Sequence, residues 1–389
     1  MSDLDVGSGT LGAVGEWRGV ELDGLVLHSG RLTLRPWQPS DATQVAAMLA
    51  DGRAATYLPL PTPYTADDAR DFVTGLGRDG RLTGRRLDCA IAENTTGRLV
   101  GSASLRLPVT PHEVAEIGYW LATAEWGNGT GEEYATEAVR TLARFGLGNG
   151  LARIEIRCEV PNAASAAVAL RAGFRFEAFR RAALQGRDGP LDAAVFARTA
   201  TDPDEPVPPA WPALAPLTDG VVTVRQTGPD DWPVLLAEAN NDASRQWGFG
   251  GEPMTEAVAR QRASWAGLIR LTGGTNALLI CDAATGAGAG IMGLHRFGPP
   301  GVVMIGYGVL PEFRGRRFTT RALRLLADWT FSRTPVARLE LGCKVDNVAS
   351  ARAALAAGFV AEGRQAGRLP NPDGSYSDEL VFGLTRPAG

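Results

Sequence analysis

The chain is poor in lysine, in histidine and in paired cysteines. Lys344 is its only lysine, so the Gly-x-x-x-x-Gly-Lys motif of P-loop proteins is excluded. Its four cysteines lack Cys-x-x-Cys spacing and its three histidines form no His-x-x-x-His pair, so no metal site is predicted. We interpret the cysteines as buried strand thiols and His295, beside the strand GIMGLHRF, as a structural histidine.

The chain also lacks long apolar runs and an excess of basic residues. No apolar run approaches the roughly 18 residues that a membrane-spanning helix needs. The first residues, MSDLDVGSGTLG, have neither a basic start nor an apolar core, so we expect no signal peptide, no membrane association and a cytoplasmic location. A net charge of −4 does not predict the broad basic surface that nucleic-acid binding needs.

An internal repeat is the strongest pattern that is present. Residues 305–322, IGYGVLPEFRGRRFTTRA, match residues 117–138, IGYWLATAEWGNGTGEEYATEA, at Ile-Gly-Tyr and at aromatic-x-Thr-x-Ala. The first copy carries four extra residues, 130–133, which we place in the turn before the helix. Further on, CEVPNAASAAVALRAGF at 158–174 matches CKVDNVASARAALAAGF at 343–359. Two similar domains are therefore expected.

The repeat and a Pro-rich stretch predict the domain boundaries. We expect an N-terminal arm over residues 1–28, a first domain over 29–198, a linker over 199–220 and a second domain over 221–389. The linker sequence TATDPDEPVPPAWPALAPLTDG is too rich in proline for a helix or a sheet.

Each domain is expected to mix strands and helices in the same order. RLTLR predicts a strand, Thr65 and Asp68 form a capping-box pattern at a helix start, and residues 163–171 predict another helix. The order of elements implies an α/β (α+β) fold with a mixed sheet of mostly consecutive strands.

The segment that follows the repeated strand has chemistry of its own. Arg314, Gly315, Arg316 and Arg317 lie between a predicted strand and a predicted helix. Such a segment favours phosphate binding for three reasons. It offers unpaired N–H groups at a helix start, it lies at the positive end of the helix dipole, and it carries several guanidinium groups.

With these motifs in order, each half resembles the GNAT superfamily of acyl-CoA-dependent N-acyltransferases, in the branch that acetylates ribosomal-protein N-termini. The resemblance rests on the strands EIGYWL and MIGYGV, on the turns that follow them, and on Asn-x-x-Ser with Gly-Phe. This last motif occurs at Asn162, Ser165, Gly173 and Phe174 and again at Asn347, Ser350, Gly358 and Phe359. The resemblance implies two tandem GNAT-like domains with largely antiparallel sheets, splayed at the central strands and flanked by helices.

The resemblance also implies roles for particular residues. Acetyl-CoA or another acyl-CoA would be the cofactor, with its pantetheine arm along Gly308, Val309 and Leu310. Its pyrophosphate would lie on the turn formed by Arg314, Gly315, Arg316, Arg317, Phe318 and Thr319. Asn347 would contact the cofactor, and Ser350 would protonate the departing thiolate. The equivalent positions in the first copy are Trp126, Gly127, Asn128, Gly129, Asn162 and Ser165.

Both copies depart from the family pattern at the turn. Arg317 and Thr319 replace two small residues in the second copy, where added bulk is offset by added positive charge. In the first copy Trp126 stands at the position of Arg314, and Glu132 and Glu133 lie near the helix start. Because carboxylates oppose pyrophosphate, we expect weak cofactor binding there, with Glu133 placed where a phosphate would lie.

The general base is the weakest point of the pattern. Glu116 of the first copy lies where many family members keep a base, whereas the second copy has Met304. A base for the second copy would come through water or from NNDASRQWGF, where Asp242 is our choice.

Three hypotheses follow from these patterns. The first is an N-acyltransferase with a catalytic second domain and a degenerate first domain, paired as an intramolecular pseudo-dimer in a monomer or a homodimer. The second makes the first domain active, alone or with the second domain. The third is a non-catalytic acyl-CoA sensor or scaffold. Acidic residues 242, 252 and 256 favour a small-molecule amine over a protein N-terminus as acceptor.

Overall fold

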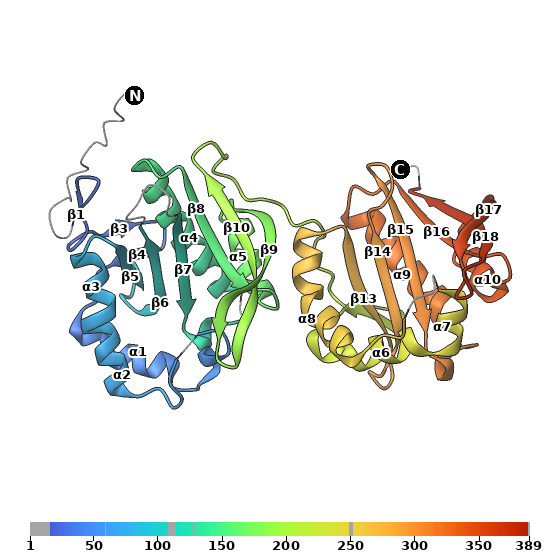
Figure 1. Cartoon of the computed structure of the whole chain (residues 1–389), viewed down its shortest axis with the longest axis horizontal. Helices are drawn as coiled ribbons and strands as arrows, with labels where there is room; N and C mark the ends of the chain where they lie inside the picture. Colours follow the sequence, from blue (N-terminus) through green and yellow to red (C-terminus); the bar gives the residue numbers. More distant parts are fainter. Residues whose placement is uncertain (1–15, 59, 108–113, 128, 249–251, 388–389) are drawn as a thin grey trace, which may run out of the picture. The chain divides into compact units, whose positions relative to one another are not determined.

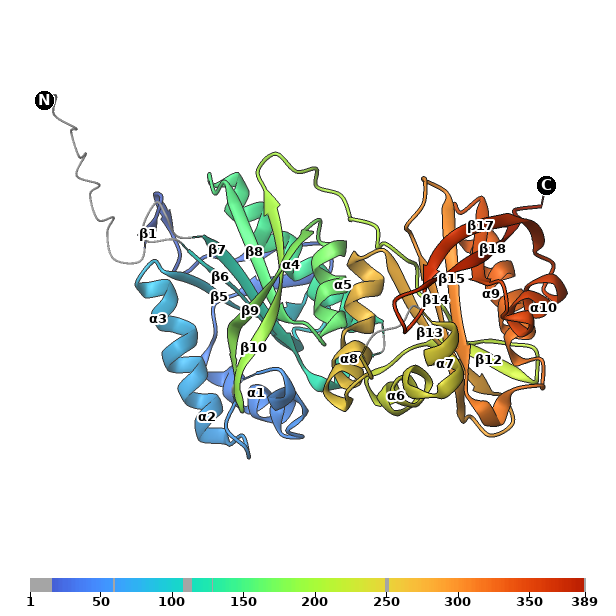
Figure 2. The same cartoon turned by 45° about the vertical axis from the view of Figure 1, so that its right-hand side comes forward.

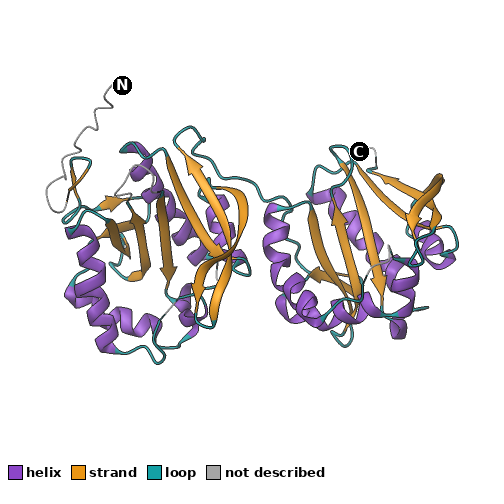
Figure 3. Cartoon of the chain, in the orientation of Figure 1, coloured by secondary structure: helices purple, strands orange, loops and turns teal. Residues whose placement is uncertain are grey.

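The computed structural model describes residues 16–58, 60–107, 114–127, 129–248 and 252–387. The chain forms two compact units that divide between Pro208 and Pro209. Each unit is a sheet with helices packed against it (Figures 1 and 3). None of the helices in the described ranges is long and apolar enough to cross a membrane.

Unit 1 contains the following strands and helices in chain order. The strands are β1 (Glu16–Trp17), β2 (Val20–Glu21), β3 (Leu27–His28), β4 (Leu32–Arg35), β5 (Arg86–Glu93), β6 (Leu99–Arg106), β7 (Ala115–Leu121), β8 (Arg153–Glu159), β9 (Arg175–Gly186) and β10 (Gly189–Thr199). The helices are α1 (Ala42–Leu49), α2 (Ala66–Asp71), α3 (Gly77–Leu82), α4 (Thr130–Gly148) and α5 (Ala163–Arg171), with a short π-helical segment (Phe72–Leu76) between α2 and α3.

Unit 2 repeats this order. Its strands are β11 (Leu217–Thr218), β12 (Val222–Gln226), β13 (Thr275–Asp282), β14 (Gly288–His295), β15 (Val302–Val309), β16 (Arg338–Lys344), β17 (Val360–Pro370) and β18 (Tyr376–Thr385). Its helices are α6 (Trp232–Asn240), α7 (Asp242–Trp247), α8 (Glu256–Thr272), α9 (Phe318–Arg333) and α10 (Val348–Ala356).

The two sheets have the same topology. Over the described residues, eight strands in unit 1 lie in the order β3-β4-β5-β6-β7-β8-β10-β9, and eight in unit 2 lie in the order β11-β12-β13-β14-β15-β16-β18-β17. Neighbouring strands are antiparallel except at the centre, where β7 runs parallel to β8 and β15 to β16. The hairpin of β9 and β10 is seen in Figure 2. The predicted mixed, largely antiparallel fold is confirmed.

Short polar motifs set where the helices begin, as the sequence predicted. The Thr65 hydroxyl accepts a hydrogen bond from the Asp68 N–H, and the Asp68 carboxylate accepts one from the Thr65 N–H, which forms the expected capping box. Asn162 and Asn347 cap α5 and α10 in nearly identical backbone conformations. The repeat therefore extends to the local geometry of the helix starts.

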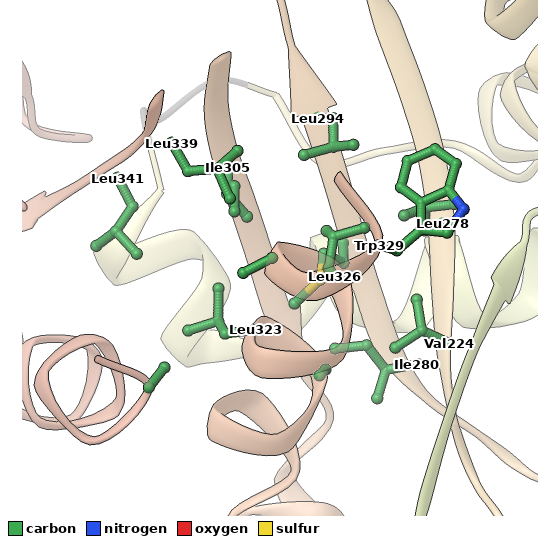
Figure 4. Close-up of a cluster of buried hydrophobic side chains, with 14 of the residues drawn as sticks. Val224, Leu278, Ile280, Leu294, Ile305, Leu323, Leu326, Trp329, Leu339 and Leu341 are labelled. Carbon is green, nitrogen blue, oxygen red and sulfur yellow. The ribbon is translucent and has the colours of Figure 1, made fainter. Parts of the chain in front are cut away.

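The core of unit 2 fixes α9 on one face of the sheet. Leu323, Leu326 and Trp329 point from α9 toward strand residues that include Leu278 and Ile305 (Figure 4). On the opposite face, α6 and α8 supply Leu235 and Ala263 to a second cluster with residues of β13. All four cysteines lie in strands and are buried, as predicted.

The Pro-rich stretch is mostly exposed but contacts the folded units at a few points. The Val207 N–H donates to the Leu170 carbonyl in unit 1. In unit 2, Trp211 is fully buried in the core, and its backbone N–H donates to the Arg270 carbonyl. Residues 200–216 form no helix or strand, but β11 lies inside the predicted linker and pairs with β12, and the prolines do not prevent an aromatic side chain from packing in the core.

One detail of the repeat was predicted wrongly. The four additional residues, 130–133, do not lie in the turn, because α4 begins at Thr130 with Gly129 as its N-cap. Four residues make about one helical turn. The helix of unit 1 therefore starts one turn earlier than α9, which begins at Phe318 after Arg317.

The core packing predicts unequal costs for two matched substitutions. Leu326 is fully buried, so Leu326→Ala should lower the free energy of unfolding of unit 2 by roughly 2–5 kcal/mol, through lost burial and a residual cavity. Leu355 is exposed on α10, so Leu355→Ala should change it by no more than about 0.5 kcal/mol. Urea denaturation followed by tryptophan fluorescence measures both, and equal costs would contradict the described core.

Candidate functional site

The central parallel strands of each sheet separate after a short paired stretch. In unit 2, Val302–Met304 pair with Arg338–Glu340, and from Ile305 onward β15 keeps its pairing with β14 alone. In unit 1 the paired stretch is limited to Ala115 and Glu116 of β7. The separated edge of β15 exposes backbone groups to which an extended ligand can hydrogen-bond.

A large cavity lies at this separation in unit 2. Its volume is about 1040 Å³, and residues from both faces of the sheet line it. Gly308, Val309, Arg314 and Thr319, all expected to contact a cofactor, are among them. Leu310 is not: its side chain is buried and its N–H donates to the Ala289 carbonyl, so that N–H is not free for a ligand.

The turn before α9 has the geometry of an anion site. Gly315 and Arg317 have φ angles of 74° and 62°, and no side chain caps the helix. The first N–H groups of α9 therefore lack both intrahelical and capping acceptors. The Phe318 side chain is buried in the core, so this residue can offer a ligand only its backbone N–H, which corrects our wider expectation for it.

Two of the three arginines of the turn are already bonded to protein groups. Arg314 donates from Nε to the Val309 carbonyl at 3.1 Å and from Nη2 to Asn241 Oδ1 at 2.7 Å. Arg316 donates from Nη2 to Asp282 at 2.7 Å and lies over the Phe318 ring. Arg317 is exposed. All three keep further donors for a phosphate, since each guanidinium has five.

Asn347 and Ser350 form one hydrogen-bonded unit with Tyr307. Asn347 Oδ1 accepts from the Ser350 N–H at 3.1 Å, which caps α10 and fixes the serine. Ser350 Oγ lies 2.8 Å from the Tyr307 hydroxyl. Burial raises the pKa of Tyr307 to about 12, so its hydroxyl stays protonated near neutral pH. All three residues line the cavity, and the pair of hydroxyls holds protons that it can donate.

Glu238 is a cavity residue that the sequence did not reveal. Its side chain is only 7% exposed, and the Ser244 hydroxyl donates to its Oε1 at 2.6 Å. The carboxylate lies against Gly308 so closely that a Cβ at Gly308 would collide with it. Burial raises the pKa of Glu238, while the Ser244 hydrogen bond and the charge of Arg314 lower it. A carboxylate with these surroundings can accept a proton beside β15.

Other ionisable residues near the cavity divide into those that line it and those that do not. His295 lines the cavity, against our structural interpretation, and burial lowers its pKa. The Thr275 hydroxyl lies 3.2 Å from His295 Nδ1. Asp242, our choice of base, is exposed at the start of α7 and is not among the residues that line the cavity, which favours Glu238 over it. Glu256 pairs with Arg260 on the surface.

The helix start of unit 1 differs from that of unit 2. Gly127 and Gly129 keep positive φ angles of 74° and 79°, while Asn128 lies outside the described residues. Glu132 forms an ion pair with Arg171, and Glu133 pairs with Arg31 at 2.7 Å. The extra helical turn of 130–133 stands where unit 2 has open N–H groups. We expected Glu133 to stand where a phosphate would lie, and its carboxylate forms the ion pair with Arg31 at the surface; the phosphate-like placement stays a prediction.

Large apolar side chains also replace the pocket residues of unit 2 in unit 1. In the repeat, Trp120 stands at the position of Gly308 and Met48 at that of Glu238. Trp120 and Met48 pack against the core cluster between the α1–α3 helices and the sheet, where Trp120 lies 6.2 Å from the Phe72 ring. Trp126 does mimic Arg314, since its Nε1 donates to the Leu121 carbonyl at 3.2 Å.

The remaining predicted residues of unit 1 are structurally equivalent to those of unit 2 or are paired with arginines. Asn162 accepts from the Ser165 N–H at 3.0 Å, and Ser165 Oγ lies 2.8 Å from the Tyr119 hydroxyl. Glu116 accepts from Arg157 and, at 3.2 Å, from Arg106. One cavity of unit 1 lies between β3 and α4.

Comparison with known proteins identifies the family. The model of the acetyltransferase (GNAT) domain matches residues 31–175 and again residues 222–360. The uncharacterized N-acetyltransferase p20 of Bacillus licheniformis is 28% identical over 172 residues, which are 44% of this chain and 93% of that protein.

Two solved structures are similar to part of the chain. The ribosomal-protein-S5-alanine acetyltransferase of Vibrio fischeri is 19% identical, with a TM-score of 0.41 over 44% of this chain and 97% of its own. RimL, a ribosomal L7/L12 alpha-N-protein acetyltransferase in complex with coenzyme A, is 23% identical, with a TM-score of 0.40 over 46% of this chain and 100% of its own.

The chain therefore belongs to the GNAT acetyltransferase family, with two GNAT domains in tandem. It is an N-acetyltransferase, and acetyl-CoA is the cofactor of this family.

The contact between Glu238 and Gly308 predicts the effect of adding one methyl group. Gly308→Ala should displace the carboxylate and lower kcat/KM by roughly tenfold to a hundredfold, because a catalytic group moved by about 1 Å loses much of its effect. Gly306→Ala is the matched control, since its Cβ would meet His295 Nε2 at an ordinary 3.4 Å. Steady-state kinetics compare the two variants, and equal losses would show that Glu238 is not the group disturbed.

Proposed function

We propose that unit 2 is the catalytic half of this N-acetyltransferase and that unit 1 is a partner domain without its own acetyl-transfer site. The observation that carries this proposal is the exchange at two facing positions. Unit 2 has Glu238 against Gly308, whereas unit 1 has Met48 and Trp120 at the same places in the repeat. A carboxylate over a glycine leaves a polar pocket beside the strand, and an indole fills that space with apolar atoms.

The residues of unit 2 fit acetyl-CoA. The free N–H groups of the first turn of α9, with Arg314, Arg316 and Arg317 around them, would hold the pyrophosphate. The open edge of β15 at Gly308 and Val309 would hold the pantetheine arm. Bound acetyl-CoA supplies the acetyl group as a thioester.

The groups proposed as base and acid differ in whether they accept or donate a proton. Glu238 would take the proton from the acceptor amine as its nitrogen bonds to the acetyl carbonyl carbon. As the carbon–sulfur bond breaks, the sulfur would receive a proton from the Ser350 and Tyr307 hydroxyl pair. Asn347 would act by fixing Ser350.

Unit 1 is proposed to serve a structural purpose. Its extra helical turn and the carboxylates 132 and 133 oppose pyrophosphate, and Glu116 is held by two arginines instead of facing an open pocket.

The role of Glu238 predicts a loss of activity and a changed pH dependence. Glu238→Gln should lower kcat/KM by roughly 10²–10⁴-fold, which is the usual contribution of a general base. Because Glu238 must be ionised to accept a proton, wild-type activity should rise with pH through its pKa, which burial raises. This rise of activity with pH, the acidic limb of the pH profile, should be absent in Glu238→Gln.

A matched control keeps this test specific. Glu312→Gln makes the same change at an exposed carboxylate just before the turn and should leave kcat/KM and the pH profile unchanged. Acetyl-CoA affinity should be retained in Glu238→Gln. Full activity of Glu238→Gln, with loss in His295→Asn, would transfer the base to the histidine.

We also propose that the acceptor is a small amine with an apolar or aromatic body. The cavity wall on the α6–α8 side is built from large apolar groups, Trp247, Met254 and Trp265, around the carboxylate of Glu238. A compact apolar body would bury against them while its amine reaches the carboxylate. The described neighbours that act on ribosomal proteins make a peptide N-terminus the alternative.

An acceptor panel tests this. With acetyl-CoA saturating, arylalkyl primary amines should show kcat/KM at least about tenfold above that of N-terminal alanine or serine peptides, because peptides bury less apolar area per amine. Trp265→Ala should erase the difference. A preference for peptides would favour a protein acceptor, and tight acetyl-CoA binding with no turnover across the panel would favour the sensor hypothesis.

A further inference from the structure

Asn241 lies between the cofactor turn and Glu238, outside the groups that the proposed chemistry uses. It is the N-cap of α7, and its Oδ1 accepts from the Ser244 N–H at 3.1 Å and from Arg314 Nη2 at 2.7 Å. Its Nδ2 donates to Ser244 Oγ at 2.9 Å and to the Glu238 carbonyl at 2.5 Å. These four bonds use the full hydrogen-bonding capacity of an asparagine amide.

Ser244 continues the connection to the carboxylate. Its Oγ accepts from Asn241 and donates to Glu238 Oε1 at 2.6 Å. A continuous path of side-chain hydrogen bonds thus runs from Arg314 through Asn241 and Ser244 to Glu238. In the low dielectric of a part-buried site such bonds polarise one another, so a change at one end is felt at the other.

The C-terminal end of α7 is fixed independently of this path. Lys344, the only lysine, is buried, and its Nζ donates to the Gln246 carbonyl at 2.9 Å. The helix therefore does not depend on the Arg314 contact alone. Breaking that contact should redistribute the bonds of Asn241 and Ser244 rather than release α7.

The two ends of the path respond to different ligands. Arg314 belongs to the turn proposed to hold pyrophosphate, and a guanidinium that engages phosphate gives up part of its interaction with an amide oxygen. Its positive charge now acts on Glu238. The other ionisable groups that line the same cavity are Arg262, His295, Tyr307 and Cys343. Among the described residues, no hydrogen bond joins any of these four side chains to the path.

We propose that Asn241 and Ser244 are positioning residues that couple phosphate binding at the Arg314 turn to the orientation and proton affinity of the Glu238 carboxylate. With the turn empty, Arg314 and Ser244 hold Glu238 as a weaker base. With phosphate on Arg314, the charge is shared with the ligand and Glu238 becomes the stronger base, so proton transfer is favoured when the cofactor is present. The inference rests on the proposed role of Glu238.

Proton uptake on binding tests the coupling without catalysis. Acetyl-CoA is titrated calorimetrically into the full chain in buffers of different ionisation enthalpy, which gives the number of protons bound. Because removing positive charge raises the pKa of a carboxyl group, wild type should take up more protons than Glu238→Gln at a pH near the acidic limb. Ser244→Ala and Asn241→Ser should reduce that difference. Equal proton uptake in wild type and Glu238→Gln would overturn the proposal.

Kinetics supply the second readout. Ser244→Ala should leave the acetyl-CoA Kd unchanged, lower kcat by roughly tenfold to a hundredfold and move the acidic limb to higher pH, since the serine stabilises the ionised carboxylate. In an Arg314→Ala background, the loss of kcat caused by Ser244→Ala should be smaller by about threefold or more, as expected for coupled groups. Ser264→Ala on α8, whose hydroxyl bonds only to the Gln261 carbonyl in the described residues, is the matched control.

These outcomes separate the two proposals. Full activity of Glu238→Gln would refute the base assignment itself. An inactive Glu238→Gln combined with a Ser244→Ala that keeps the wild-type limb and kcat would refute the relay alone.

Discussion

The separation of the two central parallel strands is the constraint on which the rest of each unit depends. In unit 2, β15 and β16 pair over Val302–Met304 and then diverge, while β15 stays bonded to β14. A strand edge is left without a partner inside a folded sheet, and its backbone groups must be satisfied by water or by a ligand. The helix that follows starts with uncapped N–H groups at the same place. One backbone feature thereby positions both an extended ligand and its phosphates.

On the proposed assignment of the catalytic half, this backbone alone is not sufficient for the site. Both have the separated strands, the capped Asn-x-x-Ser helix and a tyrosine bonded to the serine. They differ in a few side chains that decide what fits beside the strand. Glu238 over Gly308 leaves a polar pocket, whereas Trp120 fills the corresponding space with an indole. Four residues added before the helix of unit 1 lengthen it by a turn and bring carboxylates to its start. The proposal for unit 1 therefore means that a site is lost while the fold is kept.

The sequence predicted the fold well because repeat motifs and caps are local. Thr65 and Asp68, the helix at 163–171 and the strand order all follow from neighbouring residues. For the candidate site, the sequence pointed to residues that are continuous in the chain, as in the turn at 314–319. Glu238 lies on a helix of another segment, far along the chain from Gly308, and nothing in WPVLLAEAN marks it as facing the strand. The repeat contained a signal that could have been used: Met48 aligns with Glu238, and Trp120 aligns with Gly308. At both positions the residue type changes between the two copies. The turn insertion was misjudged because four residues fit a helical turn as well as a loop.

The central claim, one acetyl-CoA site and its place in unit 2, is tested most directly by calorimetric titration of acetyl-CoA into the full chain. The charge-removing variants are Arg314→Ala with Arg316→Ala in unit 2 and Glu132→Ala with Glu133→Ala in unit 1. The account predicts one site per chain, weakened by the arginine pair of substitutions and unaffected by the glutamate pair. Two sites in the wild type would contradict this prediction. So would a single site that survives the loss of both arginines and binds acetyl-CoA more tightly when the two glutamates are removed.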